Sequence, residues 1–174
     1  MTIAVDRVYP VRVPWWRLPF TAITWRRTAY VLVATPVALF GVVAAVARRG
    51  RSAHALHHRL LDRWLGPSAA PARDPAAVGP VHRGARVALF GMLSLPLNVG
   101  ALVVTVYGWS IPPMNLFYPL RAGEPPLDDA WGGPSLAGAW AVHALGGVPF
   151  AFVTAFAVWG LTTVQARLAR RVLG

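Results

Sequence analysis

The stretch VALFGMLSLPLNVGALVVTVY, residues 87–107, contains no formally charged side chain. Two further stretches share this property: TAYVLVATPVALFGVVAAVA, residues 28–47, and LAGAWAVHALGGVPFAFVTAFAVWGLTT, residues 136–163. Each is near or above the ~20 residues that a helix needs to cross a hydrocarbon core about 30 Å thick. A soluble domain of 174 residues rarely contains three such runs. The sequence therefore predicts an all-α, polytopic membrane protein with transmembrane helices at 28–47, 87–108 and 136–163.

Composition agrees with this class. Hydrophobic residues make up 56% of the chain and charged residues 13%, against roughly 25% charged residues in soluble domains. The net charge is +11, and every basic residue other than histidine is an arginine. Most of these arginines flank the apolar runs, where they would contact anionic headgroups. The charge therefore favours the lipid bilayer as a partner and argues against nucleic acid.

Several kinds of chemistry find no support in the sequence. The chain has no cysteine, which excludes disulfides and thiolate chemistry. It contains no phosphate-binding loop, no zinc motif and no recognisable pairing of a nucleophile with a base. The spacing of His54, His57 and His58 is a weak metal signal without a convincing carboxylate to complete it. We expect no catalytic residue, no metal and no cofactor.

The distribution of arginine predicts the orientation. Segment 1–27 has five arginines, 48–86 has eight, 164–174 has three, and 108–135 has one. Short loops rich in arginine stay in the cytoplasm. We therefore expect a multi-pass protein in which 109–135 is an extracytoplasmic loop and 164–174 a cytoplasmic tail. The absence of lysine and the many Ala, Arg, Gly and Pro residues are typical of a high-GC bacterium, so the expected location is a bacterial plasma membrane.

The first apolar run does not fit this pattern, because both of its flanks are rich in arginine. One interpretation is an interfacial N-terminal segment, 1–27, followed by a full crossing at 28–47. Alternatives are a run that turns back near Pro36 and Gly41, or a short extra crossing before it. The side on which the N-terminus lies stays open.

The segment 48–86 is expected to contain an amphipathic helix at 53–65 that lies on the cytoplasmic leaflet. Its apolar face would carry Ala53, Leu56, Leu60, Leu61, Trp64 and Leu65. His57, Arg59 and Arg63 would lie largely opposite.

Internal prolines and small residues predict how the spans pack. Each span contains a proline that is expected to kink it: Pro36, Pro96 and Pro149. Small residues recur every three or four positions in the last two spans, and such rows let helices approach closely. We interpret these rows as the packing seam of a hairpin formed by Gly91, Ser94, Asn98, Ala101 and Thr105 against Gly147, Ala151 and Ala155.

Asn98 and His143 are polar residues inside apolar runs, which is costly unless they find partners. They form either an interhelical hydrogen bond or the floor of a pocket. Pro112 and Pro113 are expected to end the second span, so that an aromatic loop covers this floor. The candidate ligand-binding residues are Asn98, Tyr107, Trp109, Phe117, Tyr118, Trp131, Trp140 and His143. An aromatic belt at the lipid interface explains the same rings without a ligand.

Four segments carry a family resemblance: WRRTAYVLVATPVALFGVVAAV (25–46), LHHRLLDRWLG (56–66), LFGMLSLPLNVGALVVTVYGWSIPPMNLFYPL (89–120) and ARLARRVLG (166–174). Together they resemble the actinobacterial sensor domain that often forms the membrane part of two-component histidine kinases. Members of that family usually have four spans, one more than expected here, and no kinase module follows in this chain.

The resemblance implies a stand-alone membrane sensor or accessory subunit in signal transduction. Its partner would be a histidine kinase, a regulator or a transporter subunit, and a homo-oligomer is left open. The alternative is a subunit of a transporter or other membrane complex. The family supplies no catalytic residues to transfer.

Overall fold

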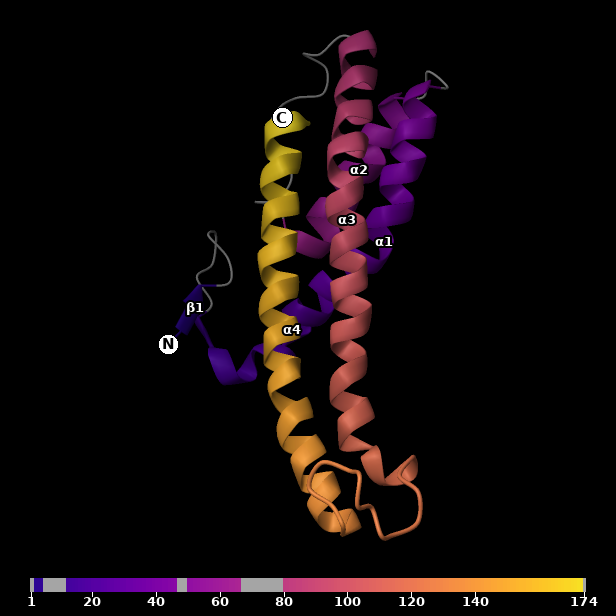
Figure 1. Cartoon of the computed structure of the whole chain (residues 1–174). Helices are drawn as coiled ribbons and strands as arrows, with labels where there is room; N and C mark the ends of the chain where they lie inside the picture. Colours follow the sequence, from indigo (N-terminus) through magenta and orange to yellow (C-terminus); the bar gives the residue numbers. More distant parts are fainter. Residues whose placement is uncertain (1, 5–11, 47–49, 67–79, 174) are drawn as a thin grey trace.

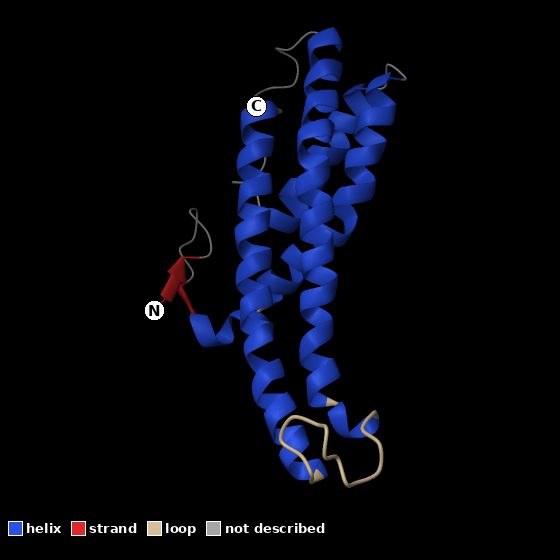
Figure 2. Cartoon of the chain, viewed as in Figure 1, coloured by secondary structure: helices blue, strands red, loops and turns tan. Residues whose placement is uncertain are grey.

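A computed structural model describes residues 2–4, 12–46, 50–66 and 80–173. Within these ranges the helices are α1 (Ala22–Val46), α2 (Gly50–Leu65), α3 (Pro80–Leu116) and α4 (Leu136–Val172), with short 3-10 turns η1 (Trp15–Phe20) and η4 (Tyr118–Leu120). Two three-residue strands, β1 (Thr2–Ala4) and β2 (Arg12–Pro14), pair antiparallel ahead of η1. The predicted all-α class is confirmed (Figure 2).

Three helices are long and apolar enough to cross a membrane: Ala22–Ala44, Gly84–Leu116 and Leu136–Val172. α3 and α4 run side by side in opposite directions, and the loop 117–135 joins them at one end of the molecule (Figure 1). α1 packs mainly on α3, so α3 lies between α1 and α4.

The first span is one uninterrupted helix that passes through Pro36 and starts at Ala22 rather than at residue 28. The alternative in which it turns back near Pro36 and Gly41 is therefore wrong. Of the N-terminal segment, η1 packs on α4 through Leu18, which lies against Ala155 and Trp159.

The second span is longer than predicted, because α3 continues through Pro112 and Pro113 to Leu116. Proline fixes φ near the helical value, so Pro112 and Pro113 can continue the helix, and they remove only the bonds to the Gly108 and Trp109 carbonyls. Beside them, the Ser110 hydroxyl donates to the Tyr107 carbonyl at 2.7 Å, and the Asn115 amide donates to the Ile111 carbonyl at 2.9 Å. The loop therefore starts after residue 116, not at 109.

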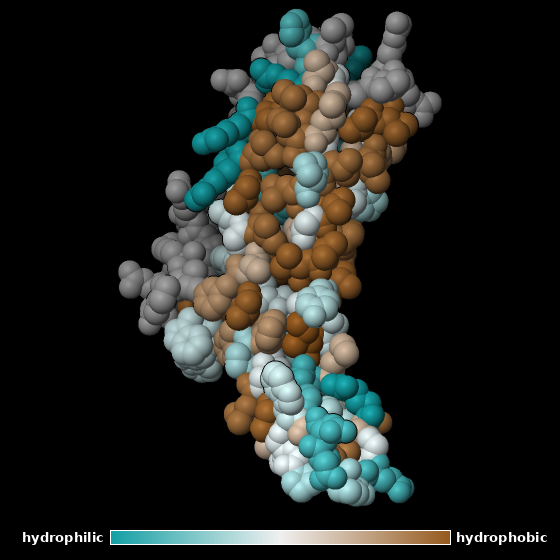
Figure 3. Space-filling model, in the orientation of Figure 1, coloured by the Kyte–Doolittle hydropathy of each residue, from teal (hydrophilic) through white to brown (hydrophobic). Residues whose placement is uncertain are grey.

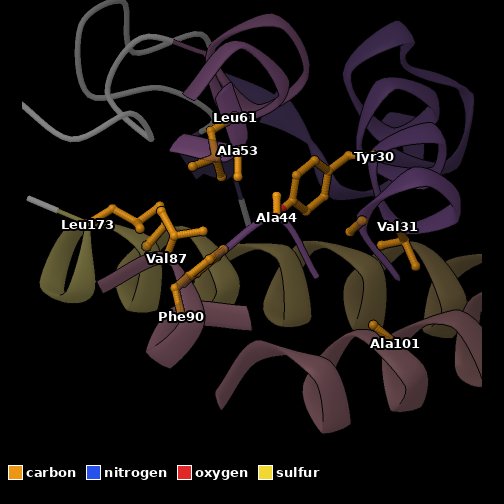
Figure 4. Packing of buried hydrophobic residues seen from close by; sticks show 11 residues of the cluster. Tyr30, Val31, Ala44, Ala53, Leu61, Val87, Phe90, Ala101 and Leu173 are labelled. Carbon is orange, nitrogen blue, oxygen red and sulfur yellow. The ribbon is translucent and has the colours of Figure 1, made fainter. Parts of the chain in front are cut away.

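α2 does not lie apart from the bundle, as a surface helix would. It folds back onto α1 and α3 and joins a hydrophobic core to which all four helices contribute. Figure 4 shows Ala53 and Leu61 of α2 near Ala44 of α1 and Val87 of α3. Residues 67–79, which follow α2 in the predicted cytoplasmic segment, lie outside the described residues.

The prediction that His57 lies on the polar face of α2 is wrong. His57 is four residues from both Ala53 and Leu61, so the three share one row, and all are buried. The His57 ring meets the Phe90 ring edge-on at 5.1 Å between centroids. A Cβ built on Gly41 would lie 2.5 Å from His57 Nε2, so only glycine leaves room for this ring. Arg59 and Arg63 are exposed, on the polar face.

Burial of His57, together with the neighbouring His54, lowers the pKa of the His57 imidazole from 6.5 to about 4. A lowered pKa means that the packed state disfavours the proton. Its stability is complete above pH 6.5 and is lost as the pH falls towards 4. We expect the packing of α2 to weaken by up to about 1.4 kcal/mol per pH unit in this window.

Amide hydrogen exchange of α2 at pH 7 and pH 5, corrected for intrinsic rates, measures this effect. His57→Leu should remove most of the pH dependence, whereas His58→Leu, at a half-buried position, should keep it. Equal pH dependence in His57→Leu and the unmodified chain would contradict the assignment.

Candidate functional site

Asn98 links the three membrane-crossing helices. Its side chain is 3% exposed, and its amide nitrogen donates to the Ala34 carbonyl of α1 at 3.3 Å. The Gln165 amide nitrogen of α4 donates to the Asn98 carbonyl oxygen at 2.7 Å. The Ala34 carbonyl can only accept, so Asn98 turns its amide nitrogen towards Ala34 and its carbonyl oxygen towards Gln165. Gln165 must therefore turn its own amide nitrogen towards Asn98. We call these three residues the Asn98 node.

Sequence reasoning identified Asn98 but missed Gln165. Gln165 lies two residues beyond the predicted end of the third span, where a polar residue needs no explanation. The structure continues α4 to Val172 and buries Gln165 to 1% exposure. Among the described residues, Gln165 Oε1 has no hydrogen-bond partner. The node can therefore accept one more hydrogen bond inside the bundle.

His143 belongs to a different part of the molecule, the end formed by the loop. Its ring stacks on Tyr118 of η4 at 3.8 Å between centroids and 18° between planes. A ring nitrogen, Nδ1, lies 2.7 Å from the Ala139 carbonyl. On Tyr118, the Arg121 guanidinium carbon lies 4.9 Å from the ring centre, and Arg121 Nε donates to the Met114 carbonyl at 3.2 Å. We call this arrangement the Tyr118 stack.

Asn98 and His143 are not brought together. Tyr118, which is level with His143, follows Asn98 by 20 residues of nearly continuous helix, or about 30 Å. They therefore do not form the floor of one pocket. The extension of α3 to Leu116, beyond the predicted end of the second span, separates them.

The predicted aromatic residues separate into two groups. Trp109 stacks on Trp25 of α1 at 4.7 Å between centroids, and its indole donates to the Thr28 hydroxyl at 3.2 Å. Trp140 donates to the Leu116 carbonyl at 2.8 Å, next to the Tyr118 stack. The remaining predicted rings are exposed: Tyr107, Phe117 and Trp131. They do not cover one common site.

A second polar cluster ties α1 to α4 and was missed by the sequence reasoning. The Arg27 guanidinium carbon lies 4.0 Å from the centre of the Trp159 ring, and Arg27 donates to the Thr162 hydroxyl at 2.7 Å. The Trp159 indole donates to the Thr24 hydroxyl at 3.0 Å, which in turn donates to the Leu18 carbonyl at 2.6 Å. A helix that begins at Ala22 places Arg27 in its second turn, facing α4.

The predicted small-residue rows lie at three interfaces rather than one. On α3 the row of Gly91, Ser94, Asn98, Ala101 and Thr105 is buried. A Cβ on Gly91 would lie 2.6 Å from Val42 of α1, so this end of the row faces α1. On α4, Gly147 faces Asn115 of α3, where a Cβ would lie 2.5 Å from Asn115 Cβ. Ala151 is half-buried, and Ala155 is buried against η1.

The fold and these contacts define an α-helical membrane protein with three helices able to cross a bilayer and a polar node joining them. The chain matches no family model, no curated protein and no solved structure. A proposal for its function therefore rests on the chain's own residues and on their arrangement in the fold.

Proposed function

We propose that the protein is a membrane sensor or accessory subunit that relays a signal from the cell envelope to a cytoplasmic or membrane partner. The observation that carries this proposal is the continuity of α3 and α4. Each has 37 residues, or about 55 Å of helix, whereas the hydrocarbon core is about 30 Å thick. A displacement of the loop 117–135 would therefore be transmitted along two packed rods to the opposite end of the bundle.

The Tyr118 stack supplies the coupling at the loop end. η4 belongs to the connection after α3, and its Tyr118 ring lies against His143 of α4. Trp140 of α4 also donates to the last carbonyl of α3, at Leu116. A ligand or partner that moves η4 would thus move the ends of both helices.

The resemblance to the actinobacterial sensor domain supports the same proposal. So does the arginine distribution, which favours an orientation with the loop outside the cytoplasm. A histidine kinase or a regulator would then contact the arginine-rich end of the bundle.

The relay can be tested without knowing the signal, because a substitution in the Tyr118 stack perturbs the loop end directly. The chain has no native cysteine, so spin labels can be attached at chosen positions. Spin labels on Ala85→Cys and Arg170→Cys would report the distance between α3 and α4 at the end far from the loop. In nanodiscs, Tyr118→Ala should shift or broaden this distance distribution. Phe117→Ala, which removes an exposed neighbouring ring, should leave it unchanged. An unchanged distribution in Tyr118→Ala would contradict coupling between the two ends.

A subunit of a membrane transporter is the second candidate, and the Asn98 node is the observation in its favour. Amide groups with an unused acceptor inside a bundle can contact a polar substrate. Substrate flux in proteoliposomes that is lost in Asn98→Leu and kept in Tyr118→Ala would favour this candidate over the sensor.

A further inference from the structure

One face of α4 changes from apolar to basic towards its C-terminal end. An exposed row at spacings of three and four, the apolar row, consists of Val153, Phe156, Gly160 and Val164. The same face continues into three exposed arginines, the arginine cluster: Arg167, Arg170 and Arg171. The spacing i, i+3, i+4 places the three guanidinium groups side by side on the helix.

The depth of the arginine cluster follows from the Asn98 node. The cluster begins two residues after Gln165, which is bonded to Asn98. Because α3 and α4 are antiparallel, the cluster is level with the turn of α3 that precedes Asn98. That turn exposes Met92 and Leu93. At the same depth, therefore, the bundle is apolar on its α3 side and basic on its α4 side.

The surface view agrees with this assignment. Hydrophilic surface follows the outer edge of the bundle beside the C-terminal end of α4, and hydrophobic surface lies directly next to it (Figure 3). α1 continues the apolar side with the exposed residues Phe40 and Val43, beside the contact of Gly91 with Val42.

Arginine side chains at this depth carry a desolvation free energy that lipid headgroups can offset. A charged side chain facing hydrocarbon is unfavourable, and bilayers respond by letting headgroups and water reach it. A guanidinium holds a phosphate through paired hydrogen bonds, which an ammonium cannot match in geometry. Phosphate groups of the surrounding leaflet are thus the natural counterions of the arginine cluster.

The apolar row supplies the second half of an amphiphile site. From Val153 to Val164 it covers eleven residues, or about 16 Å of helix, which is on the scale of an acyl chain. Gly160 interrupts the row with open space, since a Cβ built there meets no atom within 4 Å. An acyl chain can therefore lie flat along the helix while its headgroup stays at the arginines.

We propose that this face of α4 binds one anionic phospholipid of the leaflet around its C-terminal end, with the phosphate on the arginine cluster and an acyl chain along the apolar row. The site does not depend on the proposed relay, and it would be present equally in a transporter subunit.

Native mass spectrometry of the full chain in detergent tests the site with phosphatidylglycerol and phosphatidylcholine of identical acyl chains. The unmodified chain should retain phosphatidylglycerol in preference. The variant Arg167→Gln/Arg171→Gln should bind it about 30-fold more weakly, since each arginine near an anionic headgroup contributes about fivefold. The control Arg51→Gln/Arg59→Gln, at exposed positions on α2, should bind as the unmodified chain does.

A second variant separates the acyl chain from the charge. Gly160→Phe fills the flat part of the apolar row without altering any charge, and it should also weaken phosphatidylglycerol binding. Excess inorganic phosphate should not displace the lipid, because it lacks the chain. Equal retention of the two lipids would overturn the proposal. So would unchanged binding by Arg167→Gln/Arg171→Gln, displacement by phosphate, or an acidic membrane protein that occupies the arginine cluster in place of lipid.

Discussion

Gly147→Leu is expected to force α3 and α4 apart near the loop. A Cβ at this position would lie 2.5 Å from Asn115 Cβ and 3.5 Å from the Pro112 carbonyl oxygen. Asn115 Cβ is attached directly to the backbone, so no side-chain rotation relieves the contact and a helix must move. Overpacking of this kind costs about 3 kcal/mol, measured as a lower free energy of unfolding in detergent micelles.

Gly146→Leu is the matched control, because a Cβ at Gly146 meets nothing within 4 Å. The two substitutions share the same helix, the same added side chain and the same gain in helix propensity over glycine. Equal stability of the two variants would show that α3 does not pack on Gly147 as described.

Asn98→Leu is expected to lower the free energy of unfolding by about 2 kcal/mol. The substitution removes the hydrogen bonds to Ala34 and Gln165. It also leaves the whole Gln165 amide buried without a partner, since Gln165 Oε1 has none among the described residues to begin with. The double variant Asn98→Leu/Gln165→Leu should recover much of the loss, because no buried amide then remains unpaired.

Thr105→Val is the control for this prediction. Thr105 lies two turns further along the same buried row of α3, and its hydroxyl has no partner among the described residues. Its removal should be neutral or slightly stabilising. A loss in Asn98→Leu no greater than in Thr105→Val, by thermal unfolding monitored by circular dichroism, would contradict the node.

Much of the fold follows from residue pattern alone. Uncharged runs predict the three crossing helices because hydrocarbon tolerates few charges, and the row from Gly91 to Thr105 is the buried face of α3 because small residues allow close approach. These features are local, and local spacing is sufficient to find them.

Features that depend on tertiary contacts were missed or misplaced. α3 passes Pro112 and Pro113, and its last turns pack on α4, where Gly147 lies against Asn115 and the Pro112 carbonyl. His57 is buried because Gly41 leaves space for its ring on another helix. Gln165 becomes a partner of Asn98 because α4 is longer than its uncharged run. Such contacts between helices cannot be predicted from the residue pattern of a single segment.

The predicted site was affected in the same way. With the loop expected from residue 109, Asn98 and His143 are predicted to lie below one aromatic cover, at the floor of one pocket. Tyr118 instead sets the level of His143, far from the Asn98 node. Arg27 and Trp159 were overlooked because a charged residue at the edge of an apolar run suggests a headgroup contact rather than a packed one.

The central claim is that α3 and α4 both cross the membrane, with the loop 117–135 on the outer side. Single cysteines at His82, Glu124 and Arg170, all exposed, test it with an impermeant maleimide on a chain that has no other cysteine. In intact cells we expect Glu124→Cys to be labelled, and His82→Cys and Arg170→Cys to react only after permeabilisation. Labelling of Glu124→Cys and Arg170→Cys from the same side would contradict the account.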